Sequence, residues 1–157
     1  MNLNLTDKIV LVTASSKGLG KAIALEFAKE GATVLLSSRN EETLARTVVE
    51  IKELTNNPNV HFKASDMSSP NELNALFKWI SEEFSGVDIL INNTGGPTAG
   101  GFKDIADEDW MAAFEKNLLS YIRTTRSVLP NMQANDFGRI INISSSSTKE
   151  VIDGLIL

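Results

Sequence analysis

The sequence predicts a doubly wound α/β fold: a parallel sheet between two helical layers, spanning residues 1–157 as one domain. Two observations lead to this prediction. Short, nearly continuous apolar segments alternate with longer stretches of helical periodicity, a pattern typical of right-handed βαβ units. A loop that contains Gly18 and Gly20 separates the first apolar segment from the first helical one. We expect the strand order third, second, first, fourth, fifth across the sheet.

The first half of the chain supplies two strands and two helices. Residues 8–13 form a β-branched apolar run, as expected for a strand that is buried on both faces. Residues 21–30 have apolar side chains at helical spacing, and Gly31 follows where a left-handed cap is favoured. Residues 33–38 form the second strand, and Asn40 can cap a second helix that ends near residue 55.

The second half repeats the alternation. A third strand is expected over 60–65, followed by a helix over 70–84 that begins with a capping box, Ser69 to Glu72, and a proline at its first position. A fourth strand covers 87–92. A helical pattern then runs over 107–134 with an interruption near Asn117, and residues 139–144 form the fifth strand.

Composition excludes several classes of function. The chain has 157 residues, Lys+Arg 15 against Asp+Glu 20 and a net charge of -5, which argues against a nucleic-acid surface. The absence of cysteine excludes disulfides and thiolate chemistry, and a single histidine, His61, makes a metal site unexpected. No apolar run reaches membrane-spanning length, and no targeting segment is apparent. We expect a cytoplasmic protein that does not bind a membrane.

The loop after the first strand is the strongest functional signal. It reads Thr-Ala-Ser-Ser-Lys-Gly-Leu-Gly over residues 13–20. Glycines in a strand–loop–helix setting let the backbone approach a diphosphate, while the helix N-terminus presents free N–H groups to it. The alternative is an ordinary turn. On the first interpretation the fold is Rossmann-like, and the loop residues that would bind the cofactor are Thr13, Ser15, Ser16, Lys17, Gly18, Leu19 and Gly20.

The end of the second strand indicates which dinucleotide binds. A protein specific for NAD places an acidic residue there, whereas this chain has Ser38 followed by Arg39. A guanidinium can hold a 2′-phosphate through paired hydrogen bonds, and Lys17 would add positive charge. NADP is therefore favoured over NAD. The alternative is that Arg39 and Lys17 are solvated surface charges.

Asparagines end the fourth strand, in the sequence Asn-Asn-Thr-Gly-Gly over residues 92–96. Buried asparagines at a strand end can bridge backbone groups of neighbouring strands, and glycines permit a ligand to approach. Taken alone, the segment is also compatible with any tight turn.

Together these motifs resemble the short-chain dehydrogenase/reductase family, in the same order along nearly the whole chain. The resemblance implies that Asp66 and Met67 contact the adenine and that Asn93 and Gly95 lie against the cofactor. It also implies that Asn117 orders a proton-relay water and that Ser145 is the catalytic serine, with Ser144 as the alternative in a shifted register.

The resemblance implies an NADP(H)-dependent oxidoreductase that reduces a carbonyl or oxidises an alcohol of a small molecule. Its general appearance is similar to that of 3-oxoacyl-(acyl-carrier-protein) reductases, and family members assemble as homodimers or homotetramers through the helices around 117–134. The rival hypothesis is a nucleotide-binding module without catalysis.

The departures from the family pattern are specific. Ala14 replaces the first glycine, which argues against a positive φ there, and Thr94 replaces an alanine. The family's Tyr-x-x-x-Lys pair is missing: Tyr121 is the only tyrosine, and Thr125 stands where the lysine would be. The pair's expected place lies at or past Leu157, so we expect a longer biological protein of which these residues are the N-terminal part.

Several other side chains are expected to have ordinary structural roles. Trp110, Met111, Phe114 and Met132 are interpreted as packing residues, and His61 as a surface residue.

Overall fold

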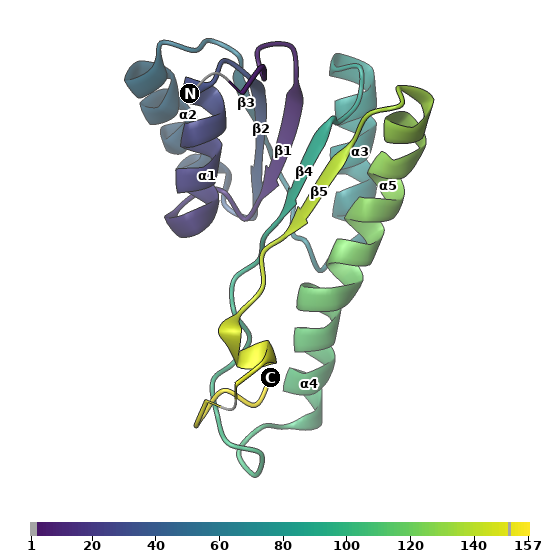
Figure 1. Ribbon diagram of the computed structural model, residues 1–157. Helices are drawn as coiled ribbons and strands as arrows, with labels where there is room; N and C mark the ends of the chain where they lie inside the picture. Colours follow the sequence, from purple (N-terminus) through teal and green to yellow (C-terminus); the bar gives the residue numbers. More distant parts are fainter. Residues whose placement is uncertain (1–2, 151) are drawn as a thin grey trace.

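The computed structural model describes residues 3–150 and 152–157 and contains one five-stranded parallel sheet (Figure 1). The strand order is β3-β2-β1-β4-β5, which confirms the predicted doubly wound topology. The strands are β1 (Ile9–Thr13), β2 (Thr33–Ser38), β3 (Val60–Ala64), β4 (Ile89–Asn92) and β5 (Arg139–Asn142). Because every pair is parallel, the carboxyl ends of all five strands lie at the same edge of the sheet.

Helices cover the two faces of the sheet unequally. One face carries α1 (Gly18–Lys29) and α2 (Glu41–Thr55), and the other carries α3 (Pro70–Glu83) and α5 (Ser120–Ala134) (Figure 1). Beyond the sheet, α4 (Asp107–Phe114) and the segments on either side of it project away from the strands. Among the described residues, none of the helices combines the length and the apolar character that crossing a bilayer requires.

The hydrophobic core is split by the sheet into two clusters. Alternate side chains of each strand point to opposite faces, so Val10 and Val12 pack towards α1 and α2 while Leu11 packs towards α3 and α5. Leu11 and Leu35 are completely buried between the two helical layers. Nearly continuous apolar runs in the central strands follow from this burial on both faces.

Side-chain caps fix where two of the helices begin. Asn40 Oδ1 accepts a hydrogen bond from Thr43 N at 2.7 Å at the start of α2. Ser69 Oγ accepts one from Glu72 N at 3.3 Å at the start of α3. The Glu72 carboxylate does not return to Ser69, as a complete capping box would require, but accepts from Asp66 N at 2.8 Å. The cap therefore also holds the loop after β3.

The predicted interruption near Asn117 is a π-helical turn, Glu115–Leu119, between α4 and α5. Elsewhere the boundaries differ modestly from expectation: α1 begins at Gly18 within the glycine loop, and β4 begins at Ile89. A short 3₁₀ turn, Ser146–Thr148, follows β5.

The interpretation of the α4 side chains as packing residues was wrong. Met111 is 69% exposed, Phe114 50% and Trp110 38%, because α4 projects beyond the sheet and has no strand beneath it. Met132, on α5, is buried as predicted. His61 is half-buried on β3, edge-on to Phe84, and burial together with the charge of Lys52 lowers its pKa.

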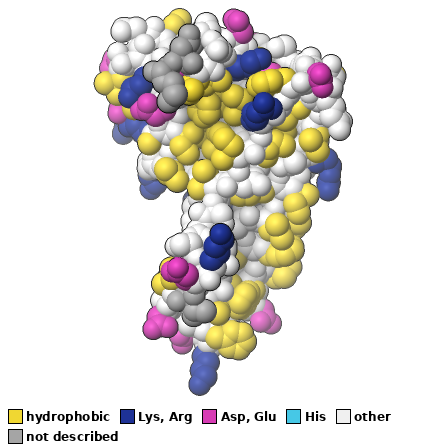
Figure 2. Space-filling model, viewed as in Figure 1, with side chains coloured by type: hydrophobic (Ala, Val, Ile, Leu, Met, Phe, Trp, Pro, Cys, Tyr) yellow, Lys and Arg dark blue, Asp and Glu magenta, His cyan; other side chains and the backbone are white. Residues whose placement is uncertain are grey.

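One part of the sheet is left open. On the side of α1 and α2, β5 has no helix over it (Figure 1), whereas Ile89 and Ile91 of the neighbouring β4 are buried in the core. Hydrophobic side chains gather on this side of the molecule, between the helices at its upper end (Figure 2). Ile141 of β5 is 46% exposed.

Candidate coenzyme site

A cavity of about 570 Å³ lies at the carboxyl ends of β1 to β4, within the usual size range of small-molecule sites. The loops that follow these four strands form its wall. The predicted residues that line it are Ser16, Lys17, Leu19, Ser38, Arg39, Asp66, Met67, Asn93 and Gly95. Nine of the predicted residues, from segments far apart in the sequence, are thus brought to one cavity.

Two residues of the glycine loop have a positive φ, one a glycine, where this is expected, and one an alanine, where it is not. Gly18 has φ 58°, in the left-handed region that glycine tolerates best. Ala14 has φ 46°, so the expectation that alanine argues against a positive φ was wrong. A left-handed alanine is strained, and the surrounding contacts must hold it in place.

Gly20 is required by close approach. A Cβ at this position would lie 2.5 Å from Ala14 O and 2.8 Å from Asn93 Nδ2. The start of α1 can therefore pack against the loop and against the end of β4 only when residue 20 has no side chain. Lys17, at the N-cap, makes no side-chain hydrogen bond to α1, which leaves the first N–H groups of the helix without that partner.

Thr13 and Asn93 join β1 to β4 beneath the cavity. Asn93 N donates to Thr13 Oγ1 at 2.8 Å, and Thr13 Oγ1 donates to Asn93 O at 2.7 Å. Asn93 Nδ2 donates to Thr13 O and, at 3.3 Å, to Ala14 O. The predicted bridging by asparagine is therefore present, and it ties the glycine loop to the neighbouring strand. Thr13 itself is completely buried and lies outside the cavity lining.

Ser15 has a similar position between β1 and β2. Its hydroxyl donates to Val12 O at 2.7 Å and accepts from Ser37 N at 3.0 Å, and the residue is fully buried. The Ser15 side chain therefore stabilises the loop from below and does not face the cavity.

The end of β2 contributes both polar and cationic groups. Ser38 and Arg39 line the cavity, with Lys17 from the glycine loop. The hydroxyls of Ser38 and Ser65 are buried and have no hydrogen-bond partner in the described part of the chain. Buried hydroxyls without partners are uncommon, and these two lie in the wall where a ligand could satisfy them.

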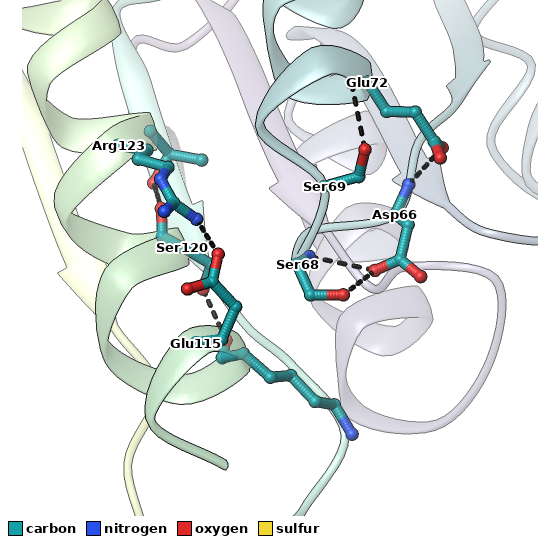
Figure 3. Close-up of polar contacts among 9 residues, drawn as sticks. Asp66, Ser68, Ser69, Glu72, Glu115, Ser120 and Arg123 are labelled. Carbon is teal, nitrogen blue, oxygen red and sulfur yellow. Dashed lines mark hydrogen bonds and ion pairs between the residues drawn. The ribbon is translucent and has the colours of Figure 1, made fainter. Parts of the chain in front are cut away.

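Asp66 is held in place by the loop after β3. Its Oδ1 accepts from Ser68 N at 2.9 Å and from Ser68 Oγ at 2.6 Å, while its own N–H is bound by Glu72 (Figure 3). Burial raises the pKa of Asp66, but the Ser68 hydrogen bonds and the charges of Arg39 and Lys116 outweigh it, and the pKa lies below its ordinary value. Asp66 is thus a fixed, ionised acceptor in the cavity wall.

A second polar cluster includes Asn117. Thr94 Oγ1 donates to Asn117 Oδ1 at 2.7 Å, which connects the end of β4 to the π-helical turn. Tyr121, one turn further, donates its phenol to Ile143 O at 3.1 Å. Burial raises the pKa of Tyr121, opposed by hydrogen bonding with Thr94. Tyr121 is therefore a poor proton donor near neutral pH, in keeping with its place outside the family motif.

Ser145 lies apart from the cavity lining. It is exposed, and its hydroxyl accepts from Ser147 Oγ at 2.8 Å and from Ser147 N at 3.2 Å at the start of the short 3₁₀ turn. Ser145 lies two residues after Ile143, whose carbonyl oxygen accepts the Tyr121 hydrogen bond. Asn117 and Gly18 also lie outside the cavity lining.

The π-helical turn is fastened by polar contacts of its own. Glu115 pairs with Arg123, and Ser120 Oγ donates to Lys116 O (Figure 3). The same turn contacts the loop after β4 through Lys116 Nζ, which donates to Gly96 O, and through Asn117 Oδ1, which accepts from Thr94 Oγ1.

Sequence reasoning missed several cavity residues: Ala14, Asn40, Thr43, Ser65, Ser68, Thr94 and Lys116. Most adjoin predicted residues, so a wider window around each strand end would have found them. Lys116 directly precedes the predicted Asn117, but it lies on the π-helical turn and not at a strand end. Only the three-dimensional arrangement brings it to the cavity.

Comparison with known proteins gives a consistent result. A family model described as short chain dehydrogenase matches residues 8–156. The oxidoreductase YvrD of Bacillus subtilis strain 168 is 42% identical over 147 residues, which are 94% of this chain and 54% of that protein. The D-beta-hydroxybutyrate dehydrogenase of Cupriavidus necator is 34% identical over 142 residues, 90% of this chain and 54% of that protein.

Two solved structures are also similar. Actinorhodin polyketide ketoreductase with NADPH matches with a TM-score of 0.89 and 34% identity, over 95% of this chain and 57% of that one. L-Sorbose reductase from Gluconobacter frateurii, complexed with NADPH and L-sorbose, matches with a TM-score of 0.90 and 30% identity, over 99% and 59%. The chain therefore spans between about half and three fifths of the length of these relatives.

Proposed function

The chain belongs to the short-chain dehydrogenase family, and from that premise we propose that it binds NADP(H) for the reduction of a carbonyl or the oxidation of an alcohol in a small molecule. The observation that carries the proposal is the charge of the cavity wall. It holds three cations, Lys17, Arg39 and Lys116, and one carboxylate, Asp66. This local excess of two positive charges occurs in a chain whose net charge is -5. A cavity of that kind attracts a phosphorylated ligand.

The residues present fit a dinucleotide phosphate. The uncapped start of α1 and the glycine loop would hold the diphosphate, since helix N-termini favour anions. Arg39 would bind the 2′-phosphate, with the unpartnered Ser38 hydroxyl as an additional donor. Asp66 and the adjacent Met67 would face the adenine. Relatives solved with NADPH support this choice of coenzyme.

The coenzyme would supply the hydride, and the protein would orient the substrate and handle the proton. We assign to Ser145 the hydrogen bond that polarises the substrate carbonyl, because its exposed hydroxyl can donate to a ligand. Asn117, anchored by Thr94, would order the water of a proton relay. A ketoacyl-type substrate is the finer hypothesis, suggested by the ketoreductase among the similar structures.

A homodimer or homotetramer is part of the proposal. Phe114 of α4, Leu118 of the π-helical turn and Ile122 of α5 recur at intervals of four, and they are 50%, 45% and 40% exposed. Three large apolar side chains in one line on the surface are typical of a subunit interface. The cytoplasmic location expected from the sequence stays a prediction.

Binding measurements on an Arg39→Gln variant test the coenzyme assignment. We expect the variant to lose at least about tenfold in NADPH affinity and to keep its NADH affinity, because only NADPH carries the 2′-phosphate. Arg46→Gln is the matched control, since Arg46 is an exposed arginine of α2 that pairs with Glu42 outside the cavity. Equal affinities of the parent protein for NADH and NADPH would refute the role of Arg39.

A further inference from the structure

Lys116 reaches the cavity from an unexpected direction. It belongs to the π-helical turn, and its Nζ donates to Gly96 O at 3.0 Å, across the loop that follows β4. The same Nζ lies 3.5 Å from the position that a Cβ on Gly95 would occupy. That distance is an ordinary van der Waals contact, so the ammonium group lies directly against the Gly95–Gly96 backbone in the cavity wall.

The ammonium group has unused bonding capacity. It carries three N–H donors, and only the one to Gly96 O is engaged with another residue in the described part of the chain. No carboxylate among residues 3–150 and 152–157 forms an ion pair with it, and the neighbouring Glu115 is paired with Arg123. Lys116 is thus a partly buried cation that lacks a counter-ion of its own.

The charge of Lys116 is felt within the cavity. Together with Arg39, it lowers the pKa of Asp66, so both cations act on the same carboxylate. They nevertheless come from different sides. Arg39 follows β2, Lys116 contacts the loop after β4, and β1 with its glycine loop lies between those two strands.

We propose that Lys116 is a coenzyme-binding residue that pairs with the phosphate groups common to NADPH and NADH. The inference rests on the proposed function and adds a second cation with a different task. Arg39 stands at the end of β2, where the 2′-phosphate is expected, whereas Lys116 lies beside the loop after β4, and the glycine loop expected to hold the diphosphate follows β1, the strand between them. Arg39 therefore discriminates between the two coenzymes, and Lys116 contributes affinity for both.

Isothermal titration of the 157-residue protein with NADPH and with NADH tests this division of roles. Lys116→Met removes the charge and keeps both the chain length and the helix propensity. We expect it to weaken the binding of NADPH and of NADH by a similar factor, about fivefold at low salt, the upper range for a solvent-accessible charge pair. The loss should shrink as the salt concentration rises.

Two control variants define the result. Lys116→Arg keeps the charge and should retain most of the affinity. Lys78→Met removes an exposed cation of α3 outside the cavity, so it reports the effect of net charge alone and should bind as the parent does. Circular dichroism verifies that each variant is folded.

The outcomes separate this inference from the proposed function. Unchanged affinities in Lys116→Met would overturn the inference and leave coenzyme binding intact. A loss of affinity confined to NADPH would overturn the inference as well, because Lys116 would then contact the 2′-phosphate, which NADH lacks. Failure of the parent protein to bind either coenzyme would overturn the proposed function and this inference together.

Discussion

Replacing Gly20 with alanine should destabilise the protein, although alanine is the better helix former. Gly20 lies in the first turn of α1, where Gly→Ala gains at most about 1 kcal/mol of helix propensity. Against this gain, the new methyl group would meet Ala14 O at 2.5 Å, Asn93 Nδ2 at 2.8 Å and Ser15 Cα at 2.9 Å. All three distances are too short for a real Cβ.

The size of the effect follows from these contacts. Overpacking a close-packed site costs about 1–3 kcal/mol, and two of the three atoms belong to the backbone and cannot move aside, so we take the upper value. Subtracting the propensity gain leaves a net loss of about 2 kcal/mol in the free energy of unfolding. For a protein of this size that corresponds to a fall of about 4–8 °C in Tm.

Urea unfolding and thermal melting followed by circular dichroism measure the loss. Gly96→Ala is the matched control, because nothing lies within 4 Å of its Cβ position, and its free energy of unfolding should change by less than about 0.5 kcal/mol. A Gly20→Ala variant as stable as the parent would refute the clearance argument. The neighbours of Gly20 would then have to move far enough to make room for a Cβ at this position.

Two further predictions concern charge and assembly. Asp66→Asn should lower the free energy of unfolding at pH 7. The pKa of Asp66 in the folded protein lies below its ordinary value of 3.8, so the ionised carboxylate stabilises the fold above pH 3.8. This stabilisation is lost as the pH falls through the folded-state pKa. Urea unfolding should show the difference in unfolding free energy between the parent and the variant shrinking as the pH is lowered from 7 to below 3.8, and a difference that stays constant over this range would contradict the assignment. Leu118→Asp should reduce the molar mass measured by light scattering, because it places a charge in the middle of the exposed apolar line formed by Phe114, Leu118 and Ile122. Leu54→Asp, on exposed α2, should leave the mass as in the parent, and a monomeric parent would rule the interface out.

The sheet and most of its site could be predicted because their signals are local. Buried parallel strands are recognisable as apolar runs in the sequence, and their carboxyl ends all lie at the same edge of the sheet. Ser38 could therefore be placed at the site from its strand end, whereas Asp66 and Asn93 are placed there through the resemblance to the family. The roles of Thr13 and Asn93 in binding stay predictions, but their bridge between β1 and β4 is explicit in the hydrogen bonds.

The remaining features depend on contacts that sequence periodicity does not encode. Ala14 has a positive φ although alanine disfavours it. Asn93 Nδ2 donates to the carbonyl of Ala14, and Ser37 N donates to the hydroxyl of the next residue, Ser15, so contacts with β2 and β4 hold this backbone. Trp110 and Phe114 have the spacing of packing residues, yet α4 extends past the sheet that would have covered them. Lys116 becomes a cavity residue only because the helix on which it lies passes beside the β4 loop.

The π-helical turn between α4 and α5 absorbs one residue more than a regular turn, because its hydrogen bonds join residues i and i+5. Deleting one residue within Glu115–Leu119 would let the turn close as an ordinary α-helical turn, and the side chains of α4 and α5 would keep their directions. A deletion in the regular part of α5 would not be absorbed in this way, because each residue of an α-helix advances the chain by about 100° around the axis. The aromatic side chains of α4 would then face a new direction. The tolerance of this long helix for a change of length is therefore confined to the π-helical turn.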